Sequence, residues 1–326
     1  MKAIVISRPG GPEVLEQREL PTPEPGAGEI RVRVRASALN RADLLQRLGR
    51  YPAPAGVPQE IPGLEYAGEV DAVGPGAGLW AVGNRVMGIV GGAAHAEFVV
   101  VHEREAIHVP QNLSWEEAAA VPEAFLTAYD ALFTRLELGM GEPVVIHAVG
   151  SGVGTAALQL ARAAGALVLG TARTAAKLAR ARELGLDVAI DASQEDWPAA
   201  VERATDGAGV QAVLNLVGGR YLPGDLRVLR TGGRVVVVGT MAGHLAELDL
   251  GLLMRKRARV EGTVLRSRPL EEKIALARAF SAGALPLFSA GRIRPVVDRV
   301  YSFGELAEAH RQLETNESFG KLVLAW

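Results

Sequence analysis

The chain has 326 residues, of which 48% are hydrophobic, 22% charged and 5% aromatic. This composition is ordinary for a soluble globular protein and excludes a disordered or collagen-like chain. With 35 basic and 37 acidic residues the formal net charge is -2, so no global field draws the chain to nucleic acid or to an anionic membrane. At roughly 100 to 200 residues per domain, the length predicts two domains.

The chain has no cysteine. This excludes disulfides, thiolate nucleophiles, iron–sulfur clusters and cysteine-ligated zinc. No apolar run reaches the roughly 18 residues of a membrane span, and the start, Met1 to Ser7, is strand-like rather than a signal peptide. We therefore expect a cytoplasmic protein without membrane association.

The first 110 residues favour strands separated by Gly-Pro and Gly-Gly turns. At 29–39, Ile30, Val32 and Val34 alternate with arginines, which predicts a strand with one buried face. Further strands are predicted at 2–7, 68–73, 85–90 and 97–101. Together they indicate an antiparallel, barrel-like domain without a long helix. A capping box, Ser114-Trp-Glu-Glu117, then predicts an Ala-rich helix to about residue 138, interrupted at Pro122.

From Pro143 onward, short apolar runs alternate with helical segments. The predicted strands are 144–148, 167–172, 188–191, 210–217, 234–239 and 260–265, and the helices between the first four are 152–165, 174–185 and 196–205. Alternation of this kind predicts a parallel, doubly wound α/β domain. The remaining elements are a helix at 270–282, an extended segment at 293–300, a helix at 304–313 and a strand at 321–325, which we expect to return to the first domain.

A glycine-rich turn joins the first predicted α/β strand to its helix. Gly150, Gly152 and Gly154 are spaced two apart, so the strict G-x-G-x-x-G pattern is absent, although Gly152-Val-Gly154-Thr-Ala-Ala157 fits its looser form. Glycines allow backbone amides to approach a pyrophosphate, and the helix N-terminus attracts its negative charge. The strand–turn–helix context favours a dinucleotide site over a tight turn without ligand.

The nucleotide is predicted to be NADPH rather than NADH. An NAD site needs an acidic residue near the end of the second strand, yet no Asp or Glu occurs from Pro143 through Arg182. Arg173 follows that strand directly and Lys177 lies four residues later, so a 2′-phosphate would meet cations. The alternative interpretation is a solvated basic helix face.

The chain resembles the zinc-free quinone oxidoreductase family of the medium-chain dehydrogenase/reductase superfamily, most closely the branch of the tumour-suppressor-inducible, NADPH-dependent enzyme. The matching segments are Ala38-Leu-Asn-Arg-Ala-Asp43, Gly63-Leu-Glu-Tyr-Ala-Gly68, Val121-Pro-Glu-Ala-Phe-Leu-Thr-Ala-Tyr129, the glycine turn, Gly232-Gly-Arg234 and Gly320-Lys-Leu-Val-Leu324. The resemblance implies a GroES-like, β-rich catalytic domain at 1–120 and 267–326, and a Rossmann-type NADPH-binding domain at 121–266. It also implies a homodimer joined through the strand near residues 260–265.

In zinc-dependent members of the superfamily, the catalytic metal is held at the positions that are Asn40, Leu64-Glu65 and Glu123 here. Two required ligands are missing, so the resemblance implies a site without metal. The six histidines show no paired ligand spacing and are interpreted as structural or surface residues.

The resemblance also assigns the cofactor contacts, in a cleft between the two domains. It places Thr127 near the nicotinamide carboxamide and the glycine turn, Ser151, Gly152, Val153 and Gly154, on the pyrophosphate. It places a loop, Gly239, Thr240 and Met241, beside the ring-side ribose. The residues at the edge of the cleft are Leu265, Ser267 and Asn316. The tyrosine that helps hold the 2′-phosphate in the closest branch is Ala192 here, and Arg173 is a candidate to compensate.

Asn40 and Tyr51 are the predicted substrate-facing residues, because an amide and a phenol can donate hydrogen bonds to a carbonyl oxygen that gains charge. Asp43 is predicted to support them from behind. The alternatives are that Tyr51 covers a proline of its loop, that Asn40 caps a turn, and that Ser151 is merely small enough for a crowded turn.

The predicted function is NADPH-dependent reduction of a small-molecule quinone. Two alternatives stay open. One is an NADPH-dependent 2-alkenal or enone reductase on the same scaffold, with Tyr51 as proton donor. The other is a nucleotide-sensing or RNA-binding protein like zeta-crystallin, against which the near-neutral charge argues.

Overall fold

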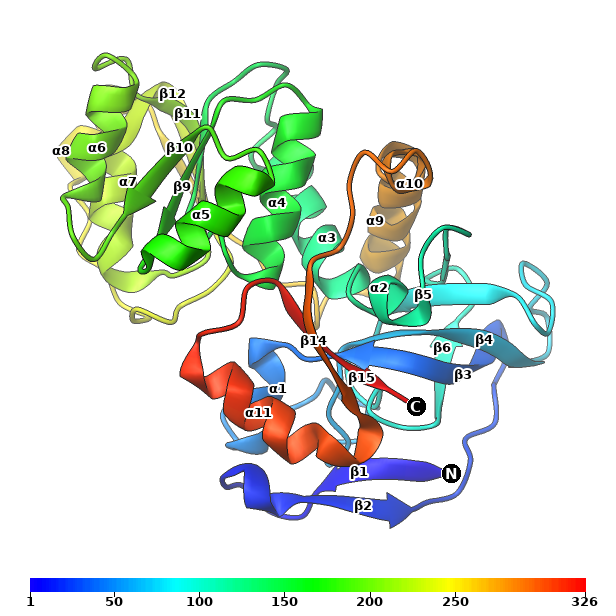
Figure 1. Cartoon of the computed structure of the whole chain (residues 1–326). Coiled ribbons are helices and arrows are strands. Elements are labelled where there is room, and N and C mark those ends of the chain that lie inside the picture. Colours follow the sequence, from blue (N-terminus) through cyan, green and yellow to red (C-terminus); the bar gives the residue numbers. More distant parts are fainter. The chain divides into compact units, whose positions relative to one another are not determined.

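The computed structural model describes residues 1–326 and divides into two compact units (Figure 1). Unit 1 comprises Met1–Leu126 together with Leu265–Trp326, and unit 2 comprises Thr127–Val264. The chain therefore leaves unit 1 once, builds unit 2 from one continuous segment, and returns. None of the helices combines the length and the apolar character that crossing a bilayer requires.

Unit 1 contains a seven-stranded sheet in the order β14-β15-β3-β4-β5-β7, with β6 paired to β3. Its pairs are antiparallel, except that β14 runs parallel to β15. A separate hairpin joins β1 and β2. The strands are β1 (Lys2–Ile6), β2 (Leu15–Glu19), β3 (Glu29–Ala38), β4 (Glu65–Val73), β5 (Arg85–Ile89), β6 (Phe98–His102), β7 (Ile107–His108), β14 (Val297–Ser302) and β15 (Lys321–Ala325).

The predicted alternation along β3 is confirmed. Ile30, Val32 and Val34 are buried in the core of unit 1, whereas the arginines between them form ion pairs on the other face. The helical elements of this part of the chain are η1 (Pro12–Val14), α1 (Arg41–Arg47), α2 (Trp115–Ala119), α3 (Pro122–Tyr129), α9 (Leu270–Gly283), α10 (Leu285–Ser289), η4 (Phe303–Glu305) and α11 (Leu306–Thr315). The predicted capping box is present, since Ser114 accepts a hydrogen bond from the backbone of Glu117 at the start of α2.

Unit 2 is the predicted doubly wound domain. Its six strands are parallel and follow the order β10-β9-β8-β11-β12-β13. The strands are β8 (Val144–Ile146), β9 (Val168–Ala172), β10 (Val188–Asp191), β11 (Val210–Asn215), β12 (Leu229–Val237) and β13 (Arg259–Gly262). The helical elements are η2 (Asp130–Arg135), α4 (Gly152–Ala163), α5 (Ala175–Glu183), α6 (Trp197–Ala204), η3 (Gly219–Tyr221), α7 (Leu222–Val228) and α8 (Leu250–Lys256).

The two faces of this sheet are covered by different helices. Apolar side chains of α6, α7 and α8 pack with β-strand residues such as Val145, Val213 and Val235, while α4 and α5 lie on the opposite side (Figure 1). The strand order reverses between β8 and β11, and ligands of such sheets bind beyond the carboxyl ends of the strands at this point. The glycine-rich turn directly follows β8, so it lies at the expected place.

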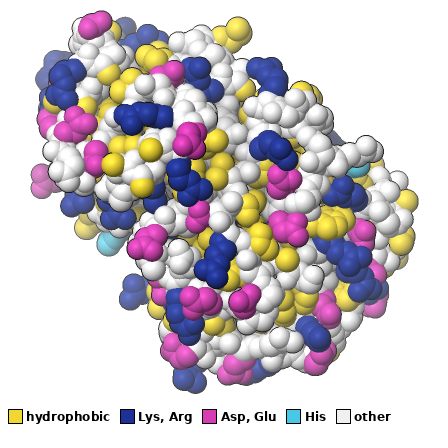
Figure 2. Space-filling model, in the orientation of Figure 1, with side chains coloured by type: hydrophobic (Ala, Val, Ile, Leu, Met, Phe, Trp, Pro, Cys, Tyr) yellow, Lys and Arg dark blue, Asp and Glu magenta, His cyan; other side chains and the backbone are white.

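Charges of both signs are interspersed over the face seen in Figure 2, with dark blue Lys and Arg atoms beside magenta Asp and Glu atoms. Many of them form ion pairs, for example Arg227 with Glu202 in unit 2 and Arg35 with Glu69 in unit 1. This distribution agrees with the small net charge of the chain.

Candidate active site

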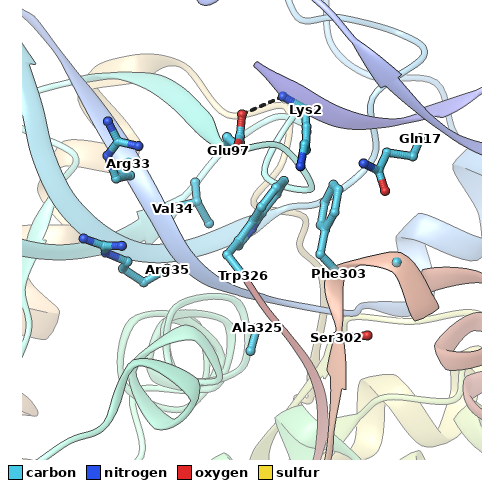
Figure 3. A pocket seen from close by; sticks show the side chains of 11 residues that line it. Lys2, Gln17, Arg33, Val34, Arg35, Glu97, Ser302, Phe303, Ala325 and Trp326 are labelled. Atoms are coloured by element: carbon cyan, nitrogen blue, oxygen red, sulfur yellow. Dashed lines mark hydrogen bonds between the residues drawn. The ribbon is translucent and has the colours of Figure 1, made fainter.

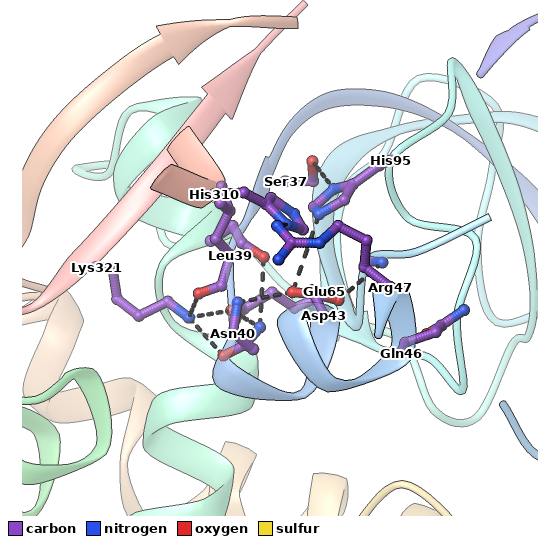
Figure 4. Close-up of polar contacts among 12 residues, drawn as sticks. Ser37, Leu39, Asn40, Asp43, Gln46, Arg47, Glu65, His95, His310 and Lys321 are labelled. Atoms are coloured by element: carbon purple, nitrogen blue, oxygen red, sulfur yellow. Dashed lines mark hydrogen bonds and ion pairs between the residues drawn. The ribbon is translucent and has the colours of Figure 1, made fainter. Parts of the chain in front are cut away.

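A buried polar cluster in unit 1 surrounds the ammonium of Lys321, the first residue of β15 (Figure 4). Lys321 Nζ donates to the backbone oxygen of Leu39 at 2.6 Å and to Asn40 Oδ1 at 2.6 Å, and it forms an ion pair with Glu65 Oε1 at 2.7 Å. Because β15 pairs with the end of β3, this strand pairing places Lys321 next to Asn40. All three ammonium protons therefore have acceptors.

Asn40, the N-cap of α1, is held in one orientation by this cluster. Its Oδ1 accepts from Lys321, and its Nδ2 donates to Glu65 Oε1 at 2.9 Å and to the backbone oxygen of Ala38 at 3.3 Å. Both amide hydrogens already have acceptors. A substrate carbonyl at Asn40 would therefore compete with an internal hydrogen bond, and the prediction that Asn40 donates to substrate stays a prediction.

Asp43 is fully buried in the first turn of α1. Its carboxylate accepts from the backbone N–H of Asn40 at 2.7 Å and from that of Gly63 at 3.0 Å. Burial raises the pKa of Asp43 to about 6, although these two hydrogen bonds favour the charged form. Asp43 thus fixes the chain on both sides of the cluster, at Asn40 and at the loop before β4.

Two glutamates, Glu65 and Glu123, meet at the cluster. Glu65 Oε2 accepts from the backbone N–H of Glu123 at 2.7 Å. Burial raises the pKa of Glu65, although the charge of Lys321 opposes this shift. Glu123 is half-buried, and burial, followed by the charge of Glu65, raises its pKa to about 8. Glu123 is therefore protonated in the folded protein at neutral pH.

A second cation, Arg266, lies in the same unit. Its guanidinium donates to the backbone oxygens of Gly91 at 2.7 Å and Tyr51 at 3.0 Å, and to Gln46 Oε1 at 2.5 Å. The charge centre lies 4.9 Å from the centroid of the Tyr51 ring. Burial lowers the pKa of Arg266, while the charge of Asp43 opposes this shift. Tyr51, a predicted substrate residue, is therefore held by its backbone and its ring.

Buried histidines lie behind the cluster (Figure 4). His95 shares a hydrogen bond of 2.9 Å with Ser37, and burial lowers the pKa of His95 to about 3. Arg47 contacts His310 and Glu314, which ties α1 to α11. Burial also lowers the pKa of His310. These neutral side chains connect elements of unit 1, in line with the structural role predicted for them.

The cluster does not fit a metal ion. The ammonium of Lys321 is bonded to Asn40 Oδ1 and Glu65 Oε1, which are two of the oxygens that a cation at this position would require. The described chain contains no group of three or more His, Cys, Asp and Glu side chains that could hold a metal ion. The donor set is also poor for zinc, which prefers thiolate and imidazole.

The features of unit 2 that are predicted to bind phosphate lie at the start of α4. Ser151 caps this helix, and its Oγ accepts from the backbone N–H of Gly154 at 3.0 Å. Ala148 adopts a left-handed φ of 48°, and a Cβ on Gly154 would lie 2.4 Å from the Ala148 oxygen. The first turn of α4 contains no acidic residue. The N–H of Ser151 donates to the Ala148 oxygen, which leaves the N–H groups of Gly152 and Val153 at the helix N-terminus as the candidates for a pyrophosphate. The assignment of Ser151, Gly152, Val153 and Gly154 to the pyrophosphate stays a prediction.

The residues predicted to meet a 2′-phosphate lie beyond β9. Arg173 directly follows this strand and is exposed, and Lys177 is in the first turn of α5. At the end of β10, the carboxylate of Asp191 accepts hydrogen bonds from the backbone and hydroxyl of Ser193. The end of β9 therefore presents a guanidinium where an NAD site would need a carboxylate.

A buried network that the sequence did not predict supports the neighbouring loops of unit 2. His147 contacts Thr171 at 2.9 Å and Asp225 at 2.7 Å, and Asp225 accepts from Asn215 at 2.5 Å. Asn215 Oδ1 in turn accepts from the backbone of residues 217 and 218. The loop after β11 is hydrogen-bonded to the loop after β12, because the N–H of Ala242 donates to the backbone oxygen of Val217. The loop after β12 contains the predicted ribose contacts Gly239, Thr240 and Met241.

The remaining predicted cofactor residues are divided between the units. Thr127 is buried in α3 and is the first residue of unit 2. Leu265, Ser267 and Asn316 belong to unit 1. Asn316 ends α11 in a left-handed conformation, and its Oδ1 accepts from Arg41 at 2.5 Å. These assignments stay predictions.

A pocket of about 460 Å³ lies elsewhere in unit 1 and contains none of the predicted site residues (Figure 3). Phe303 and Trp326 stack in it, with ring centroids 3.5 Å apart, and Glu97 accepts from the backbone of Lys2. Both rings line the pocket, whereas the predicted site residues Asn40 and Asp43 lie in the cluster around Lys321.

Comparisons with known proteins cover both units. The family described as "Alcohol dehydrogenase GroES-like domain" matches residues 26–111, and the family described as "Zinc-binding dehydrogenase" matches residues 152–281. A "Quinone oxidoreductase" of Pseudomonas aeruginosa is 35% identical over 99% of each chain. The structure of Escherichia coli quinone oxidoreductase complexed with NADPH has a TM-score of 0.89 and 30% identity, and each chain is covered to 100%. The JamJ enoyl reductase has a TM-score of 0.89 and 26% identity, covering 99% of this chain and 98% of the other.

Proposed function

Because the chain belongs to the quinone oxidoreductase family of the medium-chain dehydrogenases/reductases, and is thus an oxidoreductase, we propose that it reduces a small-molecule quinone with NADPH. The observation that carries the choice of NADPH is Arg173, an exposed cation at the end of β9, with no acidic residue from 143 through 182. A guanidinium suits a phosphate monoester and offers nothing to a ribose 2′-hydroxyl that needs an acceptor.

The protein's own contribution is binding, orientation and electrostatics. Hydride transfer is the chemistry that a nicotinamide supplies when bound. The N-terminus of α4, capped by Ser151, would hold the pyrophosphate, and Arg173 with Lys177 the 2′-phosphate. A quinone is already electrophilic, so its reduction needs no metal. Tyr51 would donate a hydrogen bond to the oxygen that gains charge, with Asn40 and Asp43 fixing the adjacent turn.

The cofactor assignment is tested with Arg173→Ala. Charge-assisted hydrogen bonds of about 1.5 to 3 kcal/mol correspond to a KM for NADPH that rises roughly 10- to 100-fold, with little change for NADH. Arg182→Ala, which removes an exposed guanidinium near the end of α5, the helix that follows Arg173, is the matched control and should leave both values unchanged. A wild-type preference for NADH would contradict the assignment.

Reduction of a 2-alkenal or enone is the second candidate function. Its support is the half-buried Tyr51 phenol, which could protonate the carbon next to the carbonyl, and the similarity to an enoyl reductase structure. Steady-state kinetics with 1,2-naphthoquinone, 1,4-benzoquinone and a 2-alkenal would rank the two functions. A kcat/KM for the alkenal far above that for both quinones would reverse the order proposed here.

A further inference from the structure

Arg266 is a buried cation that has no carboxylate among its hydrogen-bond acceptors. Its side chain belongs to a residue that is 7% exposed, and all three of its hydrogen-bond acceptors are neutral oxygens, those of Gly91, Tyr51 and Gln46. A charge taken out of water is costly unless an opposite charge or a dense set of dipoles compensates it. Retaining an arginine here therefore points to a role that a neutral side chain could not fill.

Tyr51 contacts this cation through both its ring and its backbone oxygen. The ring lies against the guanidinium with 4.9 Å between the Tyr51 centroid and Arg266 Cζ, and the Tyr51 backbone oxygen accepts from the same group. Tyr51 lies in a stretch without helix or strand, from 49 to 63. Its position therefore depends on side-chain contacts rather than on a regular element. One guanidinium fixes both the backbone and the ring.

The charges that act on the phenol have opposite effects. Burial raises the pKa of Tyr51, the positive charge of Arg266 lowers it, and the negative charge of Glu123 raises it. The groups that face Arg266 itself are Asp43, Tyr51 and Glu123. Arg266 is thus the cation that opposes burial and Glu123 at the phenol. Removing it would leave a phenol that gives up its proton less readily.

We infer that Arg266 is a positioning residue for the reaction: it holds Tyr51 in place and supplies the positive charge that lets the phenol donate to substrate. This rests on the proposed function. In the step that Arg266 supports, hydride first adds to the conjugated acceptor. The O–H bond of the Tyr51 phenol then breaks, and its proton forms a new bond to the reduced substrate. The phenolate then takes a proton from water.

The test is a double-mutant cycle with Arg266→Met and Tyr51→Phe, measured as kcat with NADPH and a 2-alkenal or quinone. The Phe variant keeps the ring and the backbone oxygen and removes the hydroxyl alone. We expect Tyr51→Phe to lower kcat about 100-fold and Arg266→Met to lower it about tenfold. In a protein that already carries Tyr51→Phe, adding Arg266→Met should lower kcat by less than about twofold. Equal loss in both backgrounds, or no loss in either, would overturn the inference.

Two further variants separate this role from a structural one. Arg266→Lys keeps the charge without the planar fork, and we expect it to recover part of the kcat lost in Arg266→Met; no recovery would argue against a role for the charge. Arg104→Met, which removes a surface guanidinium paired with Glu271, should leave kcat unchanged. The KM for NADPH should stay the same in all of them, because neither residue 51 nor 266 is placed on the nucleotide.

A readout without turnover distinguishes failure of this inference from failure of the proposed function. In protein labelled with 3-fluorotyrosine, the ¹⁹F resonance of residue 51 is assigned by its loss in Tyr51→Phe and titrated against pH. Arg266→Met should shift this titration to higher pH. An unchanged midpoint overturns the inference even if wild type reduces quinones. A shifted midpoint in a protein that reduces neither class of acceptor would leave the action of Arg266 on Tyr51 standing and show that the proposed function is wrong.

Discussion

Lys321 is the residue on which the cluster of unit 1 depends, because its ammonium bonds Leu39, Asn40 and Glu65 at once. Lys321→Met leaves the Glu65 carboxylate buried without a cation. We expect this to lower the free energy of unfolding by about 3 to 5 kcal/mol. Urea titration followed by circular dichroism measures the change. Lys2→Met, at an exposed position of β1, is the control, and a loss no larger than in that variant would contradict the assigned role.

Glu123 makes the free energy of unfolding depend on pH, and the direction of this dependence follows from the direction of its pKa shift. Its ordinary pKa of 4.5 rises to about 8 in the folded chain, so the folded state binds the proton more tightly than the unfolded state. Stability should therefore fall as pH rises from 4.5 to 8. Asp43, raised from 3.8 to about 6, adds a change of the same sign in its own window.

Glu123→Gln should flatten this profile. Above pH 8 the variant should be more stable than wild type by roughly 2 kcal/mol, a value reduced to allow for the partial exposure of the side chain, and near pH 4.5 the difference should disappear. Unfolding midpoints measured from pH 5 to 9 provide the comparison. Greater stability of wild type at high pH would show that folding does not raise the pKa of Glu123 above its ordinary value.

At the scale of single residues, the sequence indicated candidate site residues but not the hydrogen bonds and ion pairs that connect them. Asn40, Tyr51 and Asp43 were predicted from the segments that carry the family resemblance. Lys321 lies about 280 residues from Asn40 along the chain, so nothing local signals their contact. Arg266 has the same character, since its acceptors lie near residues 46, 51 and 91. Contacts between residues so far apart in the sequence arise from strand pairing and from the return of the chain to unit 1. A local sequence pattern does not predict them.

Among the elements, those with strong periodicity were predicted well and the short ones were not. The strand–turn–helix unit of β8 and α4 was predictable because a buried apolar run, glycines and an amphipathic helix follow one another. The seven-residue helix α1 was missed. It is too short to show a helical period, and Asp43, Gln46 and Arg47 fix it through bonds to distant segments. Tertiary contacts thus determine this element, as they also do for the exposed strand β2.

The turn between β8 and α4 is sterically demanding. A Cβ on Gly154 would lie 2.4 Å from the oxygen of Ala148 and 2.8 Å from atoms of Val149. We expect Gly154→Val to lower stability by about 1 to 3 kcal/mol and to weaken NADPH binding, because the first turn of α4 must shift. Thermal unfolding and fluorescence titration with NADPH measure both effects. Gly262→Ala, where a Cβ meets nothing within 4 Å, is the control within unit 2. Unchanged NADPH affinity in Gly154→Val would contradict the binding role of this turn.

For the whole molecule, we propose a homodimer. The six-stranded sheet of unit 2 ends at β13, which leaves one edge of that strand without a neighbour in the chain. Edges of this kind pair readily with another copy. Light scattering coupled to size exclusion should give about twice the chain mass of 34.4 kDa. A mass equal to one chain at micromolar concentration would contradict the proposal.

The position of β15 has a consequence for how the protein is made. This strand lies inside the seven-stranded sheet, between β14 and β3, although its residues, 321–325, are translated after those of every other strand in that sheet. Residues 127–264 form a continuous segment and can complete their sheet while the ribosome is still at work. In the other sheet, β3 stays partly unpaired until residues 321–325 have been translated. Premature termination before residue 321 would therefore leave one finished unit attached to an aggregation-prone, open sheet.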